Sequence, residues 1–174
     1  MFTQHYTNPW TMIPTDVATI AAAKKTLDIA AYTLTEPTII AAIVARAAAG
    51  VTVRVYLDRS ELESEARGNP ALPNCPLREL MNVPNITVKV KASTILMHLK
   101  SYLVDGAMLR DGSTNFSPIG ETEQDNSLTL TDDATAVGLF AAKYEAMWSR
   151  ADNMGMEQAI ESGASYKAHR QQTL

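Results

Sequence analysis

The chain has 174 residues, of which 46% are hydrophobic and 20% charged, and a formal net charge of −4. This length and composition indicate one domain with a sizeable core, and the negative charge argues against broad electrostatic capture of a polyanion. A lone cysteine, Cys75, excludes an internal disulfide and any zinc site built from a cysteine cluster.

The first fourteen residues show little periodicity, and we expect Phe2, Tyr6 and Trp10 to pack against the body of the domain. The N-terminus lacks the basic and apolar regions of an export signal, and no apolar run approaches the length of a membrane span. As given, the chain is therefore expected in the cytoplasm, or in the periplasm or outside the cell if an export signal was removed.

Helices and strands alternate over the next part of the chain. Residues 15–25 are predicted to form a helix with Thr15-Asp16 as its N-cap, and a buried strand follows over residues 27–34. Residues 35–50 predict a second helix that has a proline in its first turn and closes at a glycine, and residues 51–57 predict the next strand. This order favours parallel pairing with right-handed crossovers.

Residues 60–76 form a polar, proline-rich stretch. A loop of this length usually covers a site, so we expect a solvated lid over a substrate groove. Part of this lid could be helical. A short helix over residues 77–82 and a strand over residues 86–90 follow the lid.

The next stretch has the pattern H-x-K-x4-D-x6-G-S-x-N, whose specified positions are His98, Lys100, Asp105, Gly112, Ser113 and Asn115. Asp105-Gly106 is a strong signal for a hairpin turn between two strands, and it would place His98 and Lys100 on one strand face. The turn predicts three facing pairs, namely Val104 with Ala107, Lys100 with Asp111 and His98 with Ser113.

These side chains suit a phosphodiester. The His98 imidazole can attack phosphorus or protonate a leaving oxygen, and Lys100 supplies a positive charge for the non-bridging oxygens. Ser113 and Asn115 can donate hydrogen bonds to the same oxygens, and Gly112 lets the backbone approach the substrate closely.

After this motif we expect a loop over residues 116–124, a strand near residues 127–131 and a helix over residues 132–150 that begins with two capping aspartates. Residues 151–174 are weakly patterned. The sequence therefore predicts a single domain over residues 1–150 and a C-terminal tail.

The pattern around His98 and Lys100 resembles the HKD motif of the phospholipase D superfamily. Residues 31–35 and 50–55, and Asp125-Asn126 before a strand and a Trp-ending helix, look like the small bacterial members. These are single-motif endonucleases of about this length that work as homodimers. The similarity covers roughly residues 16–150.

The resemblance implies an α/β fold with a mixed β-sheet, largely parallel and then antiparallel, flanked by helices on both faces. It implies a phosphodiesterase that cleaves DNA or RNA through a phosphohistidine intermediate, without a cofactor or metal. Such a reaction needs a second acid opposite the nucleophile, and His5 and His169 lie in poorly patterned terminal segments. We therefore expect a homodimer in which two copies of His98 share one site.

Two carboxylates of the motif region are expected to differ in role. Asp105 lies about 20 Å along the strand from His98, too far to orient its imidazole, and we interpret it as a structural turn residue. In the small nucleases an acidic residue before Asn lies near the histidine, and Asp125 is the match here, with a shorter spacing and Asp in place of Glu. Glu121 and Glu123 are rivals that we expect at the surface.

Two other functions stay open. A phospholipase D-type lipid phosphodiesterase would need an apolar interfacial surface or a second copy of the motif, and neither is visible in the sequence. A non-catalytic nucleic-acid-binding module of the same fold would have no need of both His98 and Lys100.

Overall fold

The computed structural model describes residues 1–8, 10–66, 76–93 and 95–161, and within them the chain forms a seven-stranded sheet in the order β1-β7-β6-β5-β2-β3-β4. The strands are β1 (Phe2–Tyr6), β2 (Thr26–Ala31), β3 (Thr52–Leu57), β4 (Ile86–Val90), β5 (Lys100–Val104), β6 (Met108–Gly112) and β7 (Ser127–Thr131). The helices are α1 (Met12–Ala21), α2 (Pro37–Ala48), α3 (Arg59–Ala66), the 3-10 helix η1 (Pro76–Leu80), α4 (Pro118–Thr122) and α5 (Ala134–Trp148).

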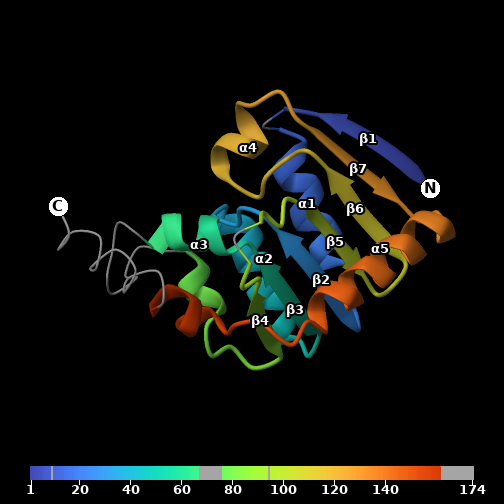
Figure 1. Cartoon of the computed structure of the whole chain (residues 1–174). Coiled ribbons are helices and arrows are strands. Elements are labelled where there is room, and N and C mark those ends of the chain that lie inside the picture. The colour runs from blue at the N-terminus through green and yellow to red at the C-terminus, as the bar shows by residue number, and fades with distance from the viewer. Residues whose placement is uncertain (9, 67–75, 94, 162–174) are drawn as a thin grey trace.

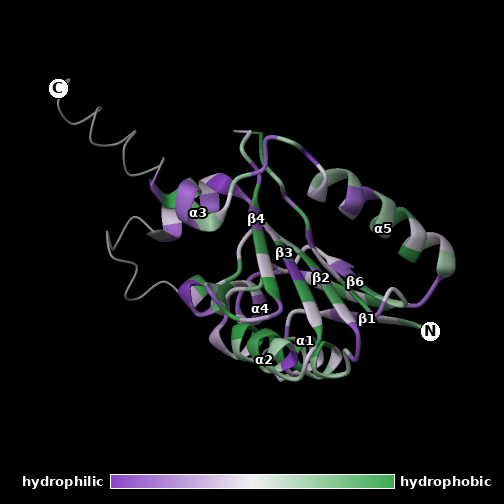
Figure 2. Ribbon diagram, turned by 90° about the horizontal axis from the view of Figure 1, so that it is seen from below, coloured by the Kyte–Doolittle hydropathy of each residue, from purple (hydrophilic) through white to green (hydrophobic). Residues whose placement is uncertain are grey.

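The sheet is mixed, as predicted. β2, β3 and β4 pair in parallel, and β5, β6, β7 and β1 add antiparallel strands on the other side of β2. Helices α1 and α2 cover one face and α5 covers the other (Figures 1 and 2). Because both faces are covered, β2 and β3 carry apolar residues toward each core, which explains their continuous apolar sequence.

The elements with clear local signals lie close to their predicted places. The Glu36 side chain accepts a hydrogen bond from the Thr38 amide at the start of α2, and Gly50 takes a φ of 91° after its end. Asp133 caps α5 by accepting from the Ala136 amide at 2.9 Å. None of the described helices is long and apolar enough to cross a membrane.

The N-terminal predictions were wrong in two respects. The residues without periodicity form the edge strand β1, which pairs with β7, and Phe2, Tyr6 and Trp10 are 70%, 73% and 85% exposed rather than packed. Helix α1 begins at Met12, so Thr15-Asp16 is not its N-cap. Asp16 instead lies inside the helix and is fully buried, where it pairs with Arg110.

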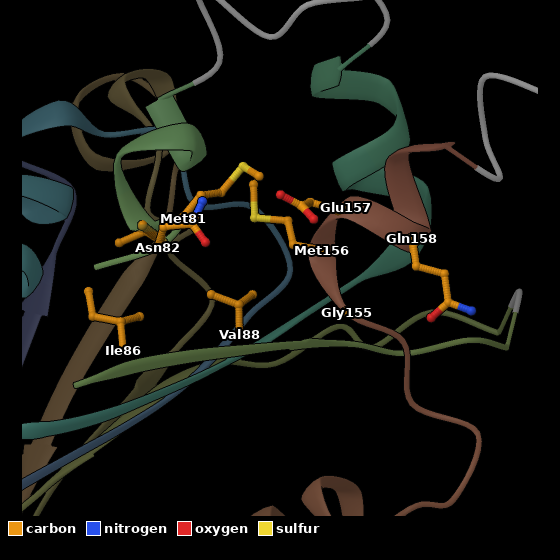
Figure 3. A pocket seen from close by; sticks show the side chains of 9 residues that line it. Met81, Asn82, Ile86, Val88, Gly155, Met156, Glu157 and Gln158 are labelled. Carbon is orange, nitrogen blue, oxygen red and sulfur yellow. The ribbon is translucent and has the colours of Figure 1, made fainter. Parts of the chain in front are cut away.

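The region after α3 and the end of the domain also differ from the sequence analysis. Helix α3 (Arg59–Ala66) takes up the first seven residues of the predicted lid, residues 60–66, and residues 67–75 lie outside the described part. Residues after position 150 contact the body of the domain: Met154 bridges to Val90, and both Met156 and Ala159 are buried in the core. A cavity of about 330 Å³ lies between η1, β4 and residues 155–158 (Figure 3).

The motif forms the predicted hairpin, with a different register. Asp105 and Gly106 take φ values of 52° and 66°, and the Ala107 amide donates to the Val104 carbonyl at 2.9 Å. Ala107 stays outside the ladder, so the facing pairs are Tyr102–Arg110, Leu103–Leu109 and Val104–Met108. The predicted pairs of Lys100 with Asp111 and His98 with Ser113 were therefore wrong by one residue, and His98 precedes the strand.

Asp105 anchors this hairpin to the start of β2. Its carboxylate accepts hydrogen bonds from the amides of Lys24, Lys25 and Thr26 at 2.7–3.2 Å, and its own amide donates to the Thr26 carbonyl. Burial raises the pKa of the Asp105 carboxyl, but the three amide donors outweigh it and hold the pKa below its ordinary value. Asp105 thus lies at the turn end of β5, opposite the end where His98 lies.

Replacing Asp105 with Ala should lower the free energy of unfolding by about 2 kcal/mol, because three amides lose their acceptor and Ala disfavours positive φ. Asp105→Asn, which tolerates this φ and keeps one acceptor oxygen, should lose about half as much. Urea unfolding monitored by circular dichroism measures both variants. An alanine variant as stable as the unmodified protein would contradict the anchoring role.

Candidate active site

The topology brings the predicted reactive residues to one end of the sheet. β2 and β3 end here, β5 begins here, and because β6 and β7 are antiparallel the end of β6 and the start of β7 lie here too. Helices α3 and α4, which follow β3 and β6, lie beside this end (Figure 1). The segments that carry His98, Lys100, Ser113, Asn115 and Asp125 therefore converge.

His98 is exposed and lies two residues before β5. The preceding residue, Met97, is buried, and its amide donates to the Asp58 carboxylate at 2.7 Å. The His98 ring lies against the Tyr32 ring, with centroids 4.5 Å apart and planes inclined by 60°. The Tyr32 amide donates to the Leu99 carbonyl at 2.8 Å, so the β2–β5 ladder itself positions this ring pair.

Lys100 points to the same aromatic ring. Its Nζ donates to the His98 carbonyl at 2.8 Å and lies 4.7 Å from the Tyr32 ring centroid. Burial lowers the pKa of Lys100 to about 8, although the negative charges of Glu61 and Asp58 raise it. The side chain is therefore still largely an ammonium ion at neutral pH.

Ser113 and Asn115 lie on the loop between β6 and α4. The Ser113 hydroxyl donates to the Asn126 side-chain oxygen and accepts from the Ser127 amide, both at 3.0 Å, so its one proton is already engaged. The Asn115 side-chain oxygen is buried and has no hydrogen-bond partner among the described residues. Phosphate binding by either side chain stays a prediction.

The structure gives a reason for glycine at position 112 that the sequence did not reveal. Its φ is 141°, and a Cβ built there would lie 2.2 Å from the Ser127 carbonyl oxygen. The close backbone approach at this glycine is therefore to β7, which holds the start of the Ser113 loop against the sheet.

Asp125 is exposed, and it lines a cavity of about 340 Å³ together with Tyr6, Thr7, Ser113, Asn126 and Ser127. Among the described residues, no carboxylate forms a hydrogen bond with the His98 ring. The structure thus places Asp125 beside Ser113, and its predicted role toward His98 stays a prediction.

Beneath the site lies a buried ion pair that the sequence analysis missed. Arg110 is fully buried and donates to both carboxylate oxygens of Asp16, at 3.1 and 2.9 Å. It also donates to the backbone carbonyls of Lys100 at 2.6 Å and Thr114 at 3.1 Å. One guanidinium therefore ties the start of β5 to the loop that carries Ser113 and Asn115.

Glu121 completes this buried cluster. It lies 3.6 Å from Arg110 and is fully buried, so the expectation that it is a surface residue was wrong. Burial, together with the charge of Asp16, raises the pKa of Glu121 to about 9, and the carboxyl is therefore protonated at neutral pH. Within the described residues, no group of three or more His, Cys, Asp or Glu side chains could hold a metal ion.

Comparison with known proteins identifies a family. The family model described as "Cardiolipin synthase, PLD-like domain" matches residues 17–148. A mitochondrial cardiolipin hydrolase from Xenopus laevis is 24% identical over 133 residues, which are 76% of this chain and 59% of that protein. The chain thus spans about three fifths of the length of this curated relative.

Two solved structures share the fold. NucT from Helicobacter pylori superposes with a TM-score of 0.74 at 20% identity, covering 89% of this chain and 99% of that one. The phospholipase D family member Nuc from Salmonella typhimurium gives a TM-score of 0.72 at 21% identity, covering 89% and 98%. The predicted fold is confirmed by this likeness.

The ion pair beneath the site predicts a large stability effect. Asp16→Ala leaves the Arg110 guanidinium buried without its carboxylate and should cost about 3–5 kcal/mol of unfolding free energy. Asp28→Ala is a suitable control, because Asp28 also binds an arginine through two hydrogen bonds, but Arg54 is 25% exposed and keeps Glu145. Its cost should be about 1 kcal/mol. Equal losses in urea unfolding would contradict the assigned difference.

Proposed function

The chain belongs to the phospholipase D superfamily, and from this membership we propose that it is a phosphodiester hydrolase that cleaves DNA or RNA. The observation that carries the proposal is the placement of an exposed imidazole and a buried ammonium against one tyrosine ring, at the sheet end where the motif loops meet. The nucleic-acid substrate is supported by the resemblance of the motif regions to single-motif endonucleases.

In the proposed reaction a nitrogen of His98 attacks the phosphorus, and the bond from phosphorus to the leaving oxygen breaks. A second acid protonates that oxygen as it leaves. Water then attacks the phosphohistidine, the P–N bond breaks, and the base formed in the first step takes the proton of the water. The phosphate remains on the other product.

The remaining side chains of the motif support the charge that develops on the phosphate. The Lys100 ammonium can bind the non-bridging oxygens, and Asn115 can add a hydrogen bond. The Ser113 hydroxyl can also donate to the phosphate once it rotates away from the Asn126 side-chain oxygen. Asp125 is proposed to lie near the His98 ring during the reaction, as the acidic residue does in the small nucleases that this chain resembles.

We propose that no metal ion takes part, because the Lys100 ammonium already supplies positive charge where the phosphate would bind and would repel a cation there. The lipid alternative is favoured by one observation, the similarity to a cardiolipin hydrolase. The intact pair of His98 and Lys100 argues against a non-catalytic binding module.

Incubation with labelled single- and double-stranded DNA and RNA in EDTA tests the activity. Cleavage should persist in EDTA, and His98→Ala or Lys100→Ala should slow it on the order of 10³-fold or more. His5→Ala is the control, since His5 lies on the edge strand β1. If the protein cleaves cardiolipin in vesicles but no nucleic acid, the proposed nuclease activity is wrong and a lipid hydrolase takes its place. Near-native rates in the His98 variant would refute the assignment of the site.

We further propose that two chains share one active site. An in-line displacement needs an acid opposite the nucleophile, and a twofold axis would bring a second His98 to that place. The apolar side chains near the motif support such a contact, because Ile95, Leu96 and Ile119 are 75%, 48% and 55% exposed.

Mixing unmodified chains with His98→Ala chains, after unfolding and reassociation, tests the shared site. If both copies of His98 are needed, activity follows the square of the unmodified fraction, and an equal mixture keeps about a quarter of it. Independent sites would keep about half. A linear dependence, with subunit exchange confirmed by mass spectrometry, would overturn the model.

A further inference from the structure

Tyr32 restrains both reactive side chains of the proposed site. The His98 ring packs beside its ring, and the Lys100 ammonium lies over it. An aromatic face attracts a cation through its quadrupole, and a ring with two rotatable bonds loses little entropy when it is fixed. Because the Tyr32 backbone continues the β2–β5 ladder, the ring has a defined place relative to the motif strand.

Glu61 approaches Tyr32 from α3. Its carboxylate accepts a hydrogen bond from the Thr33 hydroxyl at 3.2 Å. Burial raises the pKa of the Tyr32 phenol, as do its hydrogen bond with Glu61 and the negative charges of Glu61 and Asp58. The phenol therefore keeps its proton and donates a hydrogen bond to the Glu61 carboxylate.

Asp58 fixes the position of α3 relative to the motif. One of its oxygens accepts from the amides of Ser60 and Glu61, which caps the helix, and the other accepts from the amide of Met97. The same buried carboxylate thus holds the backbone of Glu61 and the residue before His98. A substitution in α3 that leaves Asp58 intact should leave this frame in place.

The charged and titratable groups that face the Lys100 ammonium come from four segments. Glu61 on α3 and Asp58 after β3 act on the ammonium through their charge, the Tyr32 ring lies beneath it, and the His98 carbonyl accepts its hydrogen bond. Asp58 is committed to donors on α3 and at Met97, whereas Glu61 accepts from the hydroxyls of Thr33 and Tyr32. Glu61 is therefore the carboxylate whose charge is available to balance a cation.

We propose that Tyr32 and Glu61 are positioning residues of the phosphoryl-transfer site: Tyr32 holds the His98 ring and the Lys100 ammonium in place, and Glu61 is the counter-charge of that ammonium. This inference rests on the proposed function. Lys100 would then be protonated and correctly oriented before the substrate binds. The substrate phosphate would replace Glu61 as the counter-charge of the ammonium.

The pH response of Lys100 tests the role of Glu61 without any substrate. An NMR titration of protein labelled with ¹³C-lysine follows the Lys100 side chain, and the spectrum of Lys100→Arg assigns its signal. Glu61→Gln should lower the titration midpoint of Lys100 by about half a pH unit or more, because burial then acts with less opposing charge. The control is Glu63→Gln on the same helix, whose partner is Arg59, and it should leave the midpoint unchanged. Equal midpoints in Glu61→Gln and the unmodified protein would overturn the proposal.

Cleavage assays on the same proteins read the proposed function separately. The alkaline limb of kcat/KM, where Lys100 loses its proton, should shift to lower pH in Glu61→Gln by the amount that NMR measures. Tyr32→Leu should lower kcat/KM about fivefold, and Tyr32→Phe, which keeps the ring, should restore most of it. If no phosphodiester is cleaved by the unmodified protein, the proposed function fails, and the NMR midpoints still decide whether Glu61 balances Lys100. Equal kcat/KM values in the Leu and Phe variants would refute the role of the Tyr32 ring.

Discussion

The buried pair of Arg110 and Asp16 is the interaction on which the arrangement of the site depends. A guanidinium removed from water is stable only when carboxylates and carbonyls satisfy its donors, and Arg110 finds them on α1, at the start of β5 and in the loop after β6. These three segments are far apart in the sequence. Each must be in place for the charge to be buried at tolerable cost, so the pair couples the core to the segments that carry the predicted site residues.

Asp58 acts in a similar way on the other side of Lys100. It is also buried, and it joins the cap of α3 to the segment before His98. Two buried carboxylates, one inside α1 and one between β3 and α3, therefore fix the backbone at Lys100 and at Met97, where the motif strand begins. The side chain of His98 is left exposed above this frame, where a phosphate can reach it.

The motif residues divide between structure and chemistry. Asp105 and Gly112 shape the backbone, one by binding three amides at the far turn and the other by fitting against β7. His98, which is exposed, and Lys100, whose ammonium is buried, lie at the opposite end of β5, and they are the groups proposed to act on the phosphate. A single sequence pattern thus describes two ends of one strand, separated by the length of the ladder.

The sequence by itself determined the fold class and the hairpin, because periodicity, caps and the Asp-Gly turn act between residues close in the chain. It also singled out His98 and Lys100 through the motif pattern, and their role in a reaction stays a prediction. It placed the hairpin register one residue off, since an Ala at the turn can join or leave the ladder without a change in local pattern. Tertiary structure alone decided the rest: that β1 is a strand because β7 offers an edge, and that Asp16 and Glu121 are buried beside Arg110. It also decided that the Lys100 ammonium lies over the Tyr32 ring. The partners of a buried charge come from distant segments, and no local pattern announces them.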